Sequence, residues 1–256
     1  TRVADQLRLR GGHLDFIGRS HIWIDDYDRA DSAQFAQFAL ANALAHTAPG
    51  QLEVLVFDDA LRGIASPFQE VNSGGEKILR HINDAQELTE TIKYLHEHVR
   101  SVLNVIQGRT ESLLDFRQQL SPKVEGFKLV VLSTIYHLLS DEIRDKLTVL
   151  LKAGPAAGVT FLIHSMKINV NKEILNLTQL CDVDERTVYG NDGAARGQFD
   201  PQSADDLISV SRGVASAVAN AQVEPVAFSE VQPLDAPWSQ SSRDGVSFAV
   251  GTYGMS

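Results

Sequence analysis

Residues 20–46 read SHIWIDDYDRADSAQFAQFALANALAH, and this stretch decides the fold. The apolar segment HIWI at 21–24 predicts a β-strand, and residues 33–45 predict an α-helix. A tight loop joins the two. A strand that leads through a tight loop into a long helix is the layout with which many proteins hold nucleotide phosphates at a helix N-terminus.

The loop at residues 26–33 lacks the chemistry of such a site. The Walker A loop, G-x-x-x-x-G-K-[ST], wraps backbone N–H groups around the phosphates, balances their charge with a lysine and holds Mg²⁺ with a hydroxyl. Here the loop carries Asp26, Asp28 and Asp31 and contains neither glycine nor lysine. Three carboxylates would repel a triphosphate. The sequence therefore predicts the scaffold of a phosphate site without its active chemistry.

Length and charge narrow the class of protein. The chain has 256 residues, of which 43% are hydrophobic, enough for one large α/β domain or two small ones. Its formal net charge is −10. Surfaces that bind duplex DNA through its phosphates usually carry an excess of basic residues, so this chain is a poor candidate for the main DNA-binding surface.

The single cysteine, Cys181, excludes an internal disulfide framework and a cysteine-rich zinc site, and it fits a reducing compartment. No apolar run reaches the roughly 18–20 residues that span a bilayer. The N-terminus has no apolar region of the signal-peptide type. We therefore expect a cytoplasmic location and no membrane insertion. Because the sequence begins with Thr1 rather than Met, we also expect it to be cut from a longer protein.

Apolar strands alternate with amphipathic segments along the chain, which predicts an α/β fold with a mostly parallel central sheet flanked by helices. The predicted strands are 21–24, 53–57, 128–132 and 159–164, and the predicted helices are 33–45, 85–103, 110–119 and 141–153. Loops are expected at 73–75 and 121–126. Further on, we expect a short strand near Cys181, a flexible loop at 189–201, a helix or loose tail at 205–221, and a strand at 246–250.

These blocks resemble, in order and without a gap, the motor domain of FtsK/SpoIIIE type in the FtsK–HerA superfamily, over roughly residues 10–200. In that family the first strand leads into Walker A and a helix. On residues 20–44, the family's lysine position falls on Ser32 and the following Ser/Thr position on Ala33. The resemblance implies a degenerate Walker A at Asp26, Asp31, Ser32 and Ala33.

The later blocks match the family in the same way. The segment LAHTAPGQLEVLVFDDA keeps the family's aspartate at Asp58 but has Ala60 at its lysine position. FKLVVLSTIYHLL resembles the Walker B strand, and its two acidic positions fall on Ser133 and Thr134. A Walker B pair needs carboxylates to anchor Mg²⁺ and polarise the attacking water. In KAGPAAGVTFLIHSM, Gly158 fits, and the family's polar sensor position falls on Met166.

The resemblance implies a RecA-like three-layer sandwich and a tandem protein. It divides the chain into lead-in strands (1–20), a degenerate ATPase domain (21–200), a linker or extension (201–236) and the start of a following motor domain (237–256). The last part rests on PWSQSSRDGVSFAVG, which is similar to the opening of family motor domains.

The implied function is a non-catalytic module of a larger DNA translocase, which scaffolds or regulates an adjacent active motor. This domain would have no catalytic residues and no cofactor, whereas the neighbouring motor domain would use ATP and Mg²⁺. Its partners would be that motor domain, other subunits of a ring and, through the full-length protein, duplex DNA. The alternative is a degenerate module of a type VII secretion motor of EccC type, which docks a protein substrate.

A third hypothesis comes from the aspartates at the strand ends. If the strands before Asp25 and Asp58 are neighbours, their carboxylates gather at one sheet edge. Asp26, Asp58 and Asp59 would then be weak candidates for a Mg²⁺ pocket of receiver type, with Thr134 and Lys167 as helpers. The alternative is that the helix dipole favours acidic residues at helix N-termini.

The remaining candidates are histidines and arginines. His96 and His98 share a predicted helix, but neighbours two apart do not face the same side, so structural or surface roles are expected. Arg100, Arg109 and Arg117 are either solvated charges or include an arginine that serves a neighbouring subunit's site.

Overall fold

The computed structural model describes residues 2–25, 30–59, 61–119 and 126–221. The chain forms two units, residues 1–219 and 220–256, and the first is described here. Asp26, Asp28, Ala60, most of the loop at 121–126 and the predicted start of a motor domain at 237–256 lie outside the described residues.

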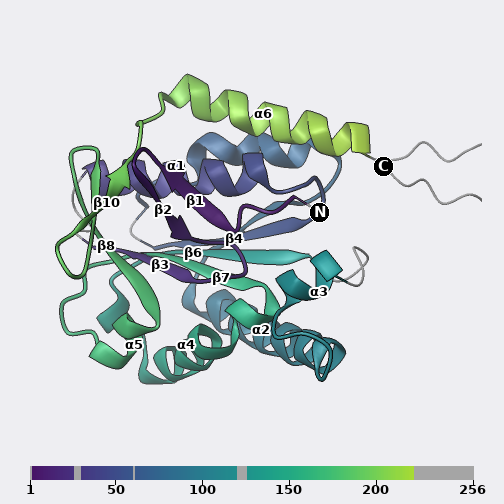
Figure 1. The fold of residues 1–256 in the computed structure, drawn as a ribbon, viewed down its shortest axis with the longest axis vertical. Helices are drawn as coiled ribbons and strands as arrows, with labels where there is room; N and C mark the ends of the chain where they lie inside the picture. Colours follow the sequence, from purple (N-terminus) through teal and green to yellow (C-terminus); the bar gives the residue numbers. More distant parts are fainter. Residues whose placement is uncertain (1, 26–29, 60, 120–125, 222–256) are drawn as a thin grey trace, which may run out of the picture. The chain divides into compact units, whose positions relative to one another are not determined.

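The described residues form an eight-stranded sheet in the order β10-β9-β8-β3-β7-β6-β4-β5 (Figure 1). All pairings from β8 to β5 are parallel, whereas β9 and β10 pair antiparallel. The strands are β3 (His21–Ile24), β4 (Leu52–Asp58), β5 (Leu79–Ile82), β6 (Phe127–Ser133), β7 (Val159–His164), β8 (Thr178–Asp184), β9 (Thr187–Gly190) and β10 (Ala195–Gln198). The predicted α/β class with a mostly parallel central sheet is confirmed, as are all four predicted strands.

The central strands are covered on both faces. Every residue of β3, β6 and β7 is buried, which explains why these strands are continuous apolar runs instead of alternating patterns. In Figure 1, α1 and α6 lie over one face of the sheet, and α2 and α4 lie over the other. The result is the predicted three-layer arrangement.

The helices follow the predicted pattern with shifted ends. They are α1 (Ala30–His46), α2 (Ala85–Ile106), α3 (Leu113–Gln119), α4 (Asp141–Ala153), α5 (Lys172–Asn176) and α6 (Ala204–Ala221), with 3₁₀ turns η1 (Ser66–Gly74), η2 (Tyr136–Leu138) and η3 (Pro155–Ala157). The predicted start of α3 at Thr110 is wrong, because the Ser112 hydroxyl accepts the N–H of Asp115 and so caps the helix later. The predicted loop at 73–75 is also partly wrong, since η1 continues to Gly74. No described helix has the length and apolar character needed to cross a membrane.

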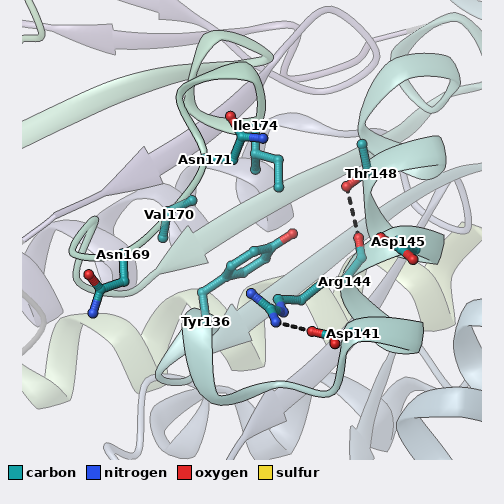
Figure 2. A pocket seen from close by; sticks show the side chains of 9 residues that line it. All are labelled: Tyr136, Asp141, Arg144, Asp145, Thr148, Asn169, Val170, Asn171 and Ile174. Carbon is teal, nitrogen blue, oxygen red and sulfur yellow. Dashed lines mark hydrogen bonds and ion pairs between the residues drawn. The ribbon is translucent and has the colours of Figure 1, made fainter.

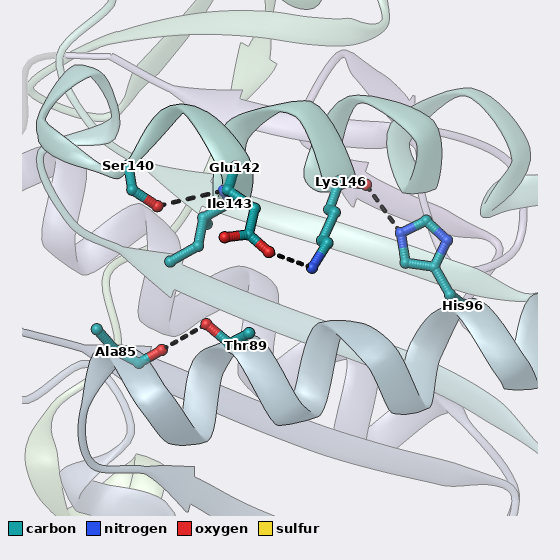
Figure 3. A network of polar contacts seen from close by, with 7 residues as sticks. All are labelled: Ala85, Thr89, His96, Ser140, Glu142, Ile143 and Lys146. Carbon is teal, nitrogen blue, oxygen red and sulfur yellow. Dashed lines mark hydrogen bonds and ion pairs between the residues drawn. The ribbon is translucent and has the colours of Figure 1, made fainter.

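Polar contacts fix α4 against α2 (Figure 3). The Ser140 hydroxyl accepts the N–H of Ile143 and caps α4. His96 Nε2, on α2, lies 3.1 Å from the backbone oxygen of Lys146 on α4. This contact gives His96 the structural role that was expected.

The stretch 189–201, predicted as a flexible loop, is instead a β-hairpin. Strands β9 and β10 pair across a turn in which Gly193 adopts φ +75° and Arg196 forms a 2.9 Å ion pair with Asp192. Asn-Asp-Gly between two short runs is a hairpin signal, and the glycine supplies the left-handed backbone that the turn requires. The high glycine content concealed this pattern.

The N-terminal residues form a separate hairpin of β1 (Gln6–Leu9) and β2 (Gly12–Asp15). A backbone bridge joins Arg10 to Gln198 at the end of β10. A Cβ at Gly12 would lie 2.0 Å from the Arg196 backbone oxygen, so only glycine allows this approach. The first residues of the domain are thereby tied to its last strand.

Helix α6 packs on the domain. Its buried residues are Leu207, Ser211, Ala215 and Val218. Arg212 binds both carboxylate oxygens of Glu70 on η1, at 2.8 and 3.0 Å. Part of the predicted extension at 201–236 is therefore a helix docked against η1.

Candidate functional site

The candidate site lies where the central parallel strands end. Open α/β sheets bind their ligands outside the carboxyl ends of the strands, next to the helix N-termini. Here β7 lies between β3 and β6, and β4 follows β6. The start of α1 and the end of β6, where degenerate phosphate-site motifs are predicted, therefore lie on either side of β7.

A buried histidine connects these two motifs. His164, the last residue of β7, places Nε2 3.0 Å from the Ser32 hydroxyl and Nδ1 3.3 Å from the Ser133 hydroxyl. All three residues have no solvent-exposed surface. Ser32 comes from the first turn of α1, and Ser133 ends β6. We call this set the Ser32–His164–Ser133 bridge.

The bridge contains no acidic side chain and no lysine. Two hydroxyls and an imidazole provide neither an acid to anchor Mg²⁺ nor a lysine to balance phosphate charge. The Ser32 hydroxyl lies beside His164, and the residue is buried. The two residues predicted to stand at the lysine and first acidic positions are thus brought together by a third that the motif did not include.

Thr134 and Asp59 meet beside the bridge. The Thr134 hydroxyl donates to Asp59 at 2.9 Å, and the Thr134 N–H lies 3.3 Å from the backbone oxygen of His164. This is the contact between a predicted Walker B position and a predicted metal candidate. It ties the loops after β4 and β6 together.

The other carboxylates do not gather, so that expectation is wrong. Two strands, β7 and β6, lie between β3 and β4. Asp58 accepts the backbone N–H groups of Arg62 and Gly63 with its two oxygens, at 3.0 and 2.7 Å, and so shapes its own loop. The Asp25 carboxylate accepts the backbone N–H of Lys167 and forms an ion pair with the Lys167 Nζ, both at 2.9 Å. Among the described residues, which leave out Asp26, no group of three His, Cys, Asp or Glu side chains could hold a metal.

The remaining motif residues are placed as follows. Asp31 accepts the N–H of Glu185 at 2.9 Å, which fixes the start of α1 to the turn between β8 and β9. Ala33 and Met166 are half-buried. Ser165, beside Met166, accepts the N–H of Tyr136 at 3.0 Å.

His21, at the start of β3, is a second fully buried histidine. Its Nδ1 accepts the backbone N–H of Phe161 at 2.9 Å, so its Nε2 carries the proton and donates to the Leu151 oxygen at 3.0 Å. Burial lowers the pKa of His21 from 6.5 to about 4, although the bond to Leu151 acts in the opposite direction. His21 is therefore a neutral structural residue.

Two other candidates have structural positions. Arg117 is buried, its guanidinium donates to Gln51, and it lies 5.3 Å from the centre of the Phe127 ring. An arginine held in this way cannot reach a neighbouring subunit, so that option is wrong for Arg117. Cys181 is buried, and burial raises the pKa of its thiol to about 12.

His164 is the residue that sequence reasoning missed. Its partners lie 132 and 31 positions away in the sequence, so no local pattern links them. A signal was present, since a histidine that ends a fully buried strand must find polar partners at the carboxyl edge of the sheet.

Comparisons with known proteins give structures but no sequence relatives. No protein-family model matches the chain, and no curated protein matches it. EssC (ATPases 2 and 3) from Geobacillus thermodenitrificans aligns with a TM-score of 0.64 and 11% identity over 88% of this chain and 51% of that chain. The cytoplasmic domain of the type VII secretion ATPase EccC from Thermomonospora curvata aligns at 0.61 and 17%, over 83% and 29%.

A third structure comes from another kind of motor. The pCW3 conjugation coupling protein TcpA, with ATPγS, aligns with a TM-score of 0.60 and 12% identity, over 80% of this chain and 66% of that chain. This chain thus spans between 29% and 66% of the chains that it resembles. The described residues have the fold of P-loop ATPase domains of FtsK/SpoIIIE type.

Proposed function

We propose that this chain is a non-catalytic FtsK-like module of a larger translocase, which scaffolds or regulates an adjacent active ATPase motor. The observation that supports the proposal is the Ser32–His164–Ser133 bridge. The bridge joins the two positions at which the family resemblance puts a lysine and an acid. The module itself needs no cofactor, whereas the adjacent motor uses ATP and Mg²⁺.

The bridge supports loss of the whole nucleotide site rather than the loss of a single residue. Reviving the phosphate site would require a lysine at Ser32, which has no exposed surface, and an acid at Ser133, which is equally buried. Burying either charge without a partner is costly. The packing at the carboxyl ends of the central strands therefore favours neutral side chains over the charged groups that would bind a nucleotide.

The first test is binding of ATP–Mg²⁺ to the 256-residue chain by isothermal titration, together with release of inorganic phosphate. We expect no saturable heat and no turnover above buffer. The Ser32→Ala variant is the matched control, since removing a hydroxyl of the bridge should leave both readings at the same baseline. Micromolar binding with turnover that Ser32→Ala abolishes would overturn the proposal.

For the cargo, our leading hypothesis is duplex DNA carried by the full-length protein in the cytoplasm, with other subunits of a ring as partners. The alternative is protein cargo in a secretion motor of EccC type. The net charge of −10 favours the alternative for the contacts made by this module, because an acidic surface repels DNA phosphates. A neighbour of this fold, EccC from T. curvata, was solved in complex with a signal sequence peptide.

Gel shifts with the full-length protein separate the two cargoes. Duplex binding that weakens steeply between 50 and 200 mM salt is expected for a DNA translocase. If the full-length protein does not bind duplex DNA but captures a secreted substrate in a pull-down, the hypothesis of DNA cargo is rejected in favour of the secretion motor.

A further inference from the structure

A cavity of about 390 Å³ lies between η2, the first turns of α4 and the segment that leads into α5 (Figure 2). The lining residues used below are Tyr136, Arg144, Asp145, Val170, Asn171 and Ile174. None of them is a position at which the resemblance puts a catalytic residue, although Tyr136 lies within the stretch that resembles Walker B. The cavity has the size of a small ligand site.

Two hydrogen-bond donors at this cavity have no acceptor. Tyr136 is 1% exposed, and neither its hydroxyl nor Nε of Arg144 has a hydrogen-bond partner. Figure 2 shows the Tyr136 ring beside the Arg144 guanidinium, whose terminal nitrogen donates to Asp141. Burial raises the pKa of Tyr136 to about 12, although Arg144 and the Thr148 side chain act in the opposite direction, so its hydroxyl keeps its proton. Buried donors in native proteins nearly always have acceptors, so these two mark a place where a ligand oxygen is missing.

The rest of the lining limits the ligand's chemistry. Asp145 adds a carboxylate acceptor, and the side chains of Val170 and Ile174 add half-buried apolar surface. Asn171 uses its side-chain oxygen to cap α5 through Glu173, which leaves its amide nitrogen as a donor. The site therefore presents donors on one side, an acceptor on another and apolar carbon between them.

The charges of the lining favour a neutral ligand. Asp141 and Asp145 outnumber Arg144, so an anion would be repelled. A cation would satisfy the carboxylates but leave both orphaned donors unmet. A neutral group that carries an acceptor oxygen next to an N–H donor can hydrogen-bond with the donors and with the carboxylate.

We infer that this cavity binds an amide group on an apolar body. The amide oxygen accepts from Tyr136 and Arg144, the amide N–H donates to Asp145, and the apolar part packs on Ile174. The amide can belong to a free small molecule or to the backbone of a peptide. The inference does not depend on the loss of ATP chemistry at the bridge.

The test is a methyl NMR titration of the 256-residue chain with two probes, benzamide as the free amide and acetyl-Ala-Leu-Ala-amide as the peptide. Saturable shifts at Thr148, Val170 and Ile174 are expected with at least one probe. Saturation by benzamide alone assigns a small molecule, and saturation by the peptide alone assigns a peptide backbone. No saturable shift with either probe overturns the inference.

Tyr136→Phe removes only the orphaned hydroxyl. We expect about tenfold weaker probe binding, and a melting temperature about 2–4 °C higher without probe, because a buried donor without an acceptor is gone. The matched control is Tyr94→Phe, whose hydroxyl already donates to Glu53 at 3.2 Å on the surface, and it should bind like the parent. Arg144→Met removes the second donor and should also bind more weakly. Unchanged affinity in both Tyr136→Phe and Arg144→Met would contradict the inference.

Discussion

His164 and His21 sit on neighbouring strands, and each has both ring nitrogens engaged by the protein. His21 binds two backbone groups, whereas His164 binds two hydroxyls from different elements. The backbone partners of His21 hold one strand to a helix end. The hydroxyl partners of His164 hold the start of α1 to the end of β6.

Removing His164 should therefore destabilise the edge of the sheet at which the parallel strands end. His164→Ala leaves a cavity and takes away the shared partner of Ser32 and Ser133, so we expect a loss of about 3 kcal/mol in the free energy of unfolding. Urea denaturation measures it. His13→Ala is the control, since His13 is exposed on β2 and its loss should cost no more than about 0.5 kcal/mol. Equal midpoints for the two variants would show that the bridge contributes nothing to stability.

His21 makes stability depend on pH. Its pKa is about 4 in the folded chain and 6.5 when unfolded, so the unfolded chain binds more protons below pH 6.5. The contribution of His21 is fully present above that pH and is lost as the pH falls towards 4. Between pH 7 and pH 5 we expect this residue to lower the free energy of unfolding by about 2 kcal/mol.

The measurement is urea unfolding at pH 7 and pH 5, with His21→Gln as the comparison. Glutamine cannot titrate, so the difference between the two pH values should shrink by most of that amount. A variant that loses as much stability as the parent between pH 7 and pH 5 would refute the role of His21.

At the scale of elements, the glycine at the end of η1 decides how closely α6 can approach. A Cβ at Gly74 would lie 2.3 Å from the backbone oxygen of Ala215, whereas one at Gly213, on α6 itself, meets nothing within 4 Å. A methyl group thus clashes at Gly74, on the η1 side of this contact, but is free at Gly213 on α6.

We expect Gly74→Ala to destabilise the chain by about 1–3 kcal/mol, since η1 or α6 must shift. Gly213→Ala should stabilise it by about 0.5–1 kcal/mol, because alanine suits a helix interior better than glycine. Thermal unfolding of the two variants gives the comparison. If both raise the melting temperature, α6 does not pack on η1 as described.

The sequence predicts elements well where burial is one-sided or complete. The strands at 128–132 and 159–164 were found because full burial demands continuous apolar runs. The hairpin at 187–198 was missed because its strands are short, partly exposed and rich in glycine, so they carry no apolar period. The degenerate motif positions were found from their order along the chain. The contacts that His164 makes with two of them depend on the order of the strands in the sheet, and no local sequence pattern encodes that order.

At the scale of the whole molecule, β3 is the first strand of the main sheet in sequence but pairs only with late ones. Its neighbours are β7 and β8, so Ile22 pairs with Leu162 and Gln179. The hairpin before it closes on Gln198.

On a ribosome that adds roughly 5–20 residues per second, Ile22 and Trp23 therefore wait through about 140 residues of further synthesis, roughly 10–30 s, before their first strand partner emerges. For that interval the most apolar segment near the N-terminus has no sheet to join. The central place of β3 thus leaves an apolar strand without its pairing partners for most of translation.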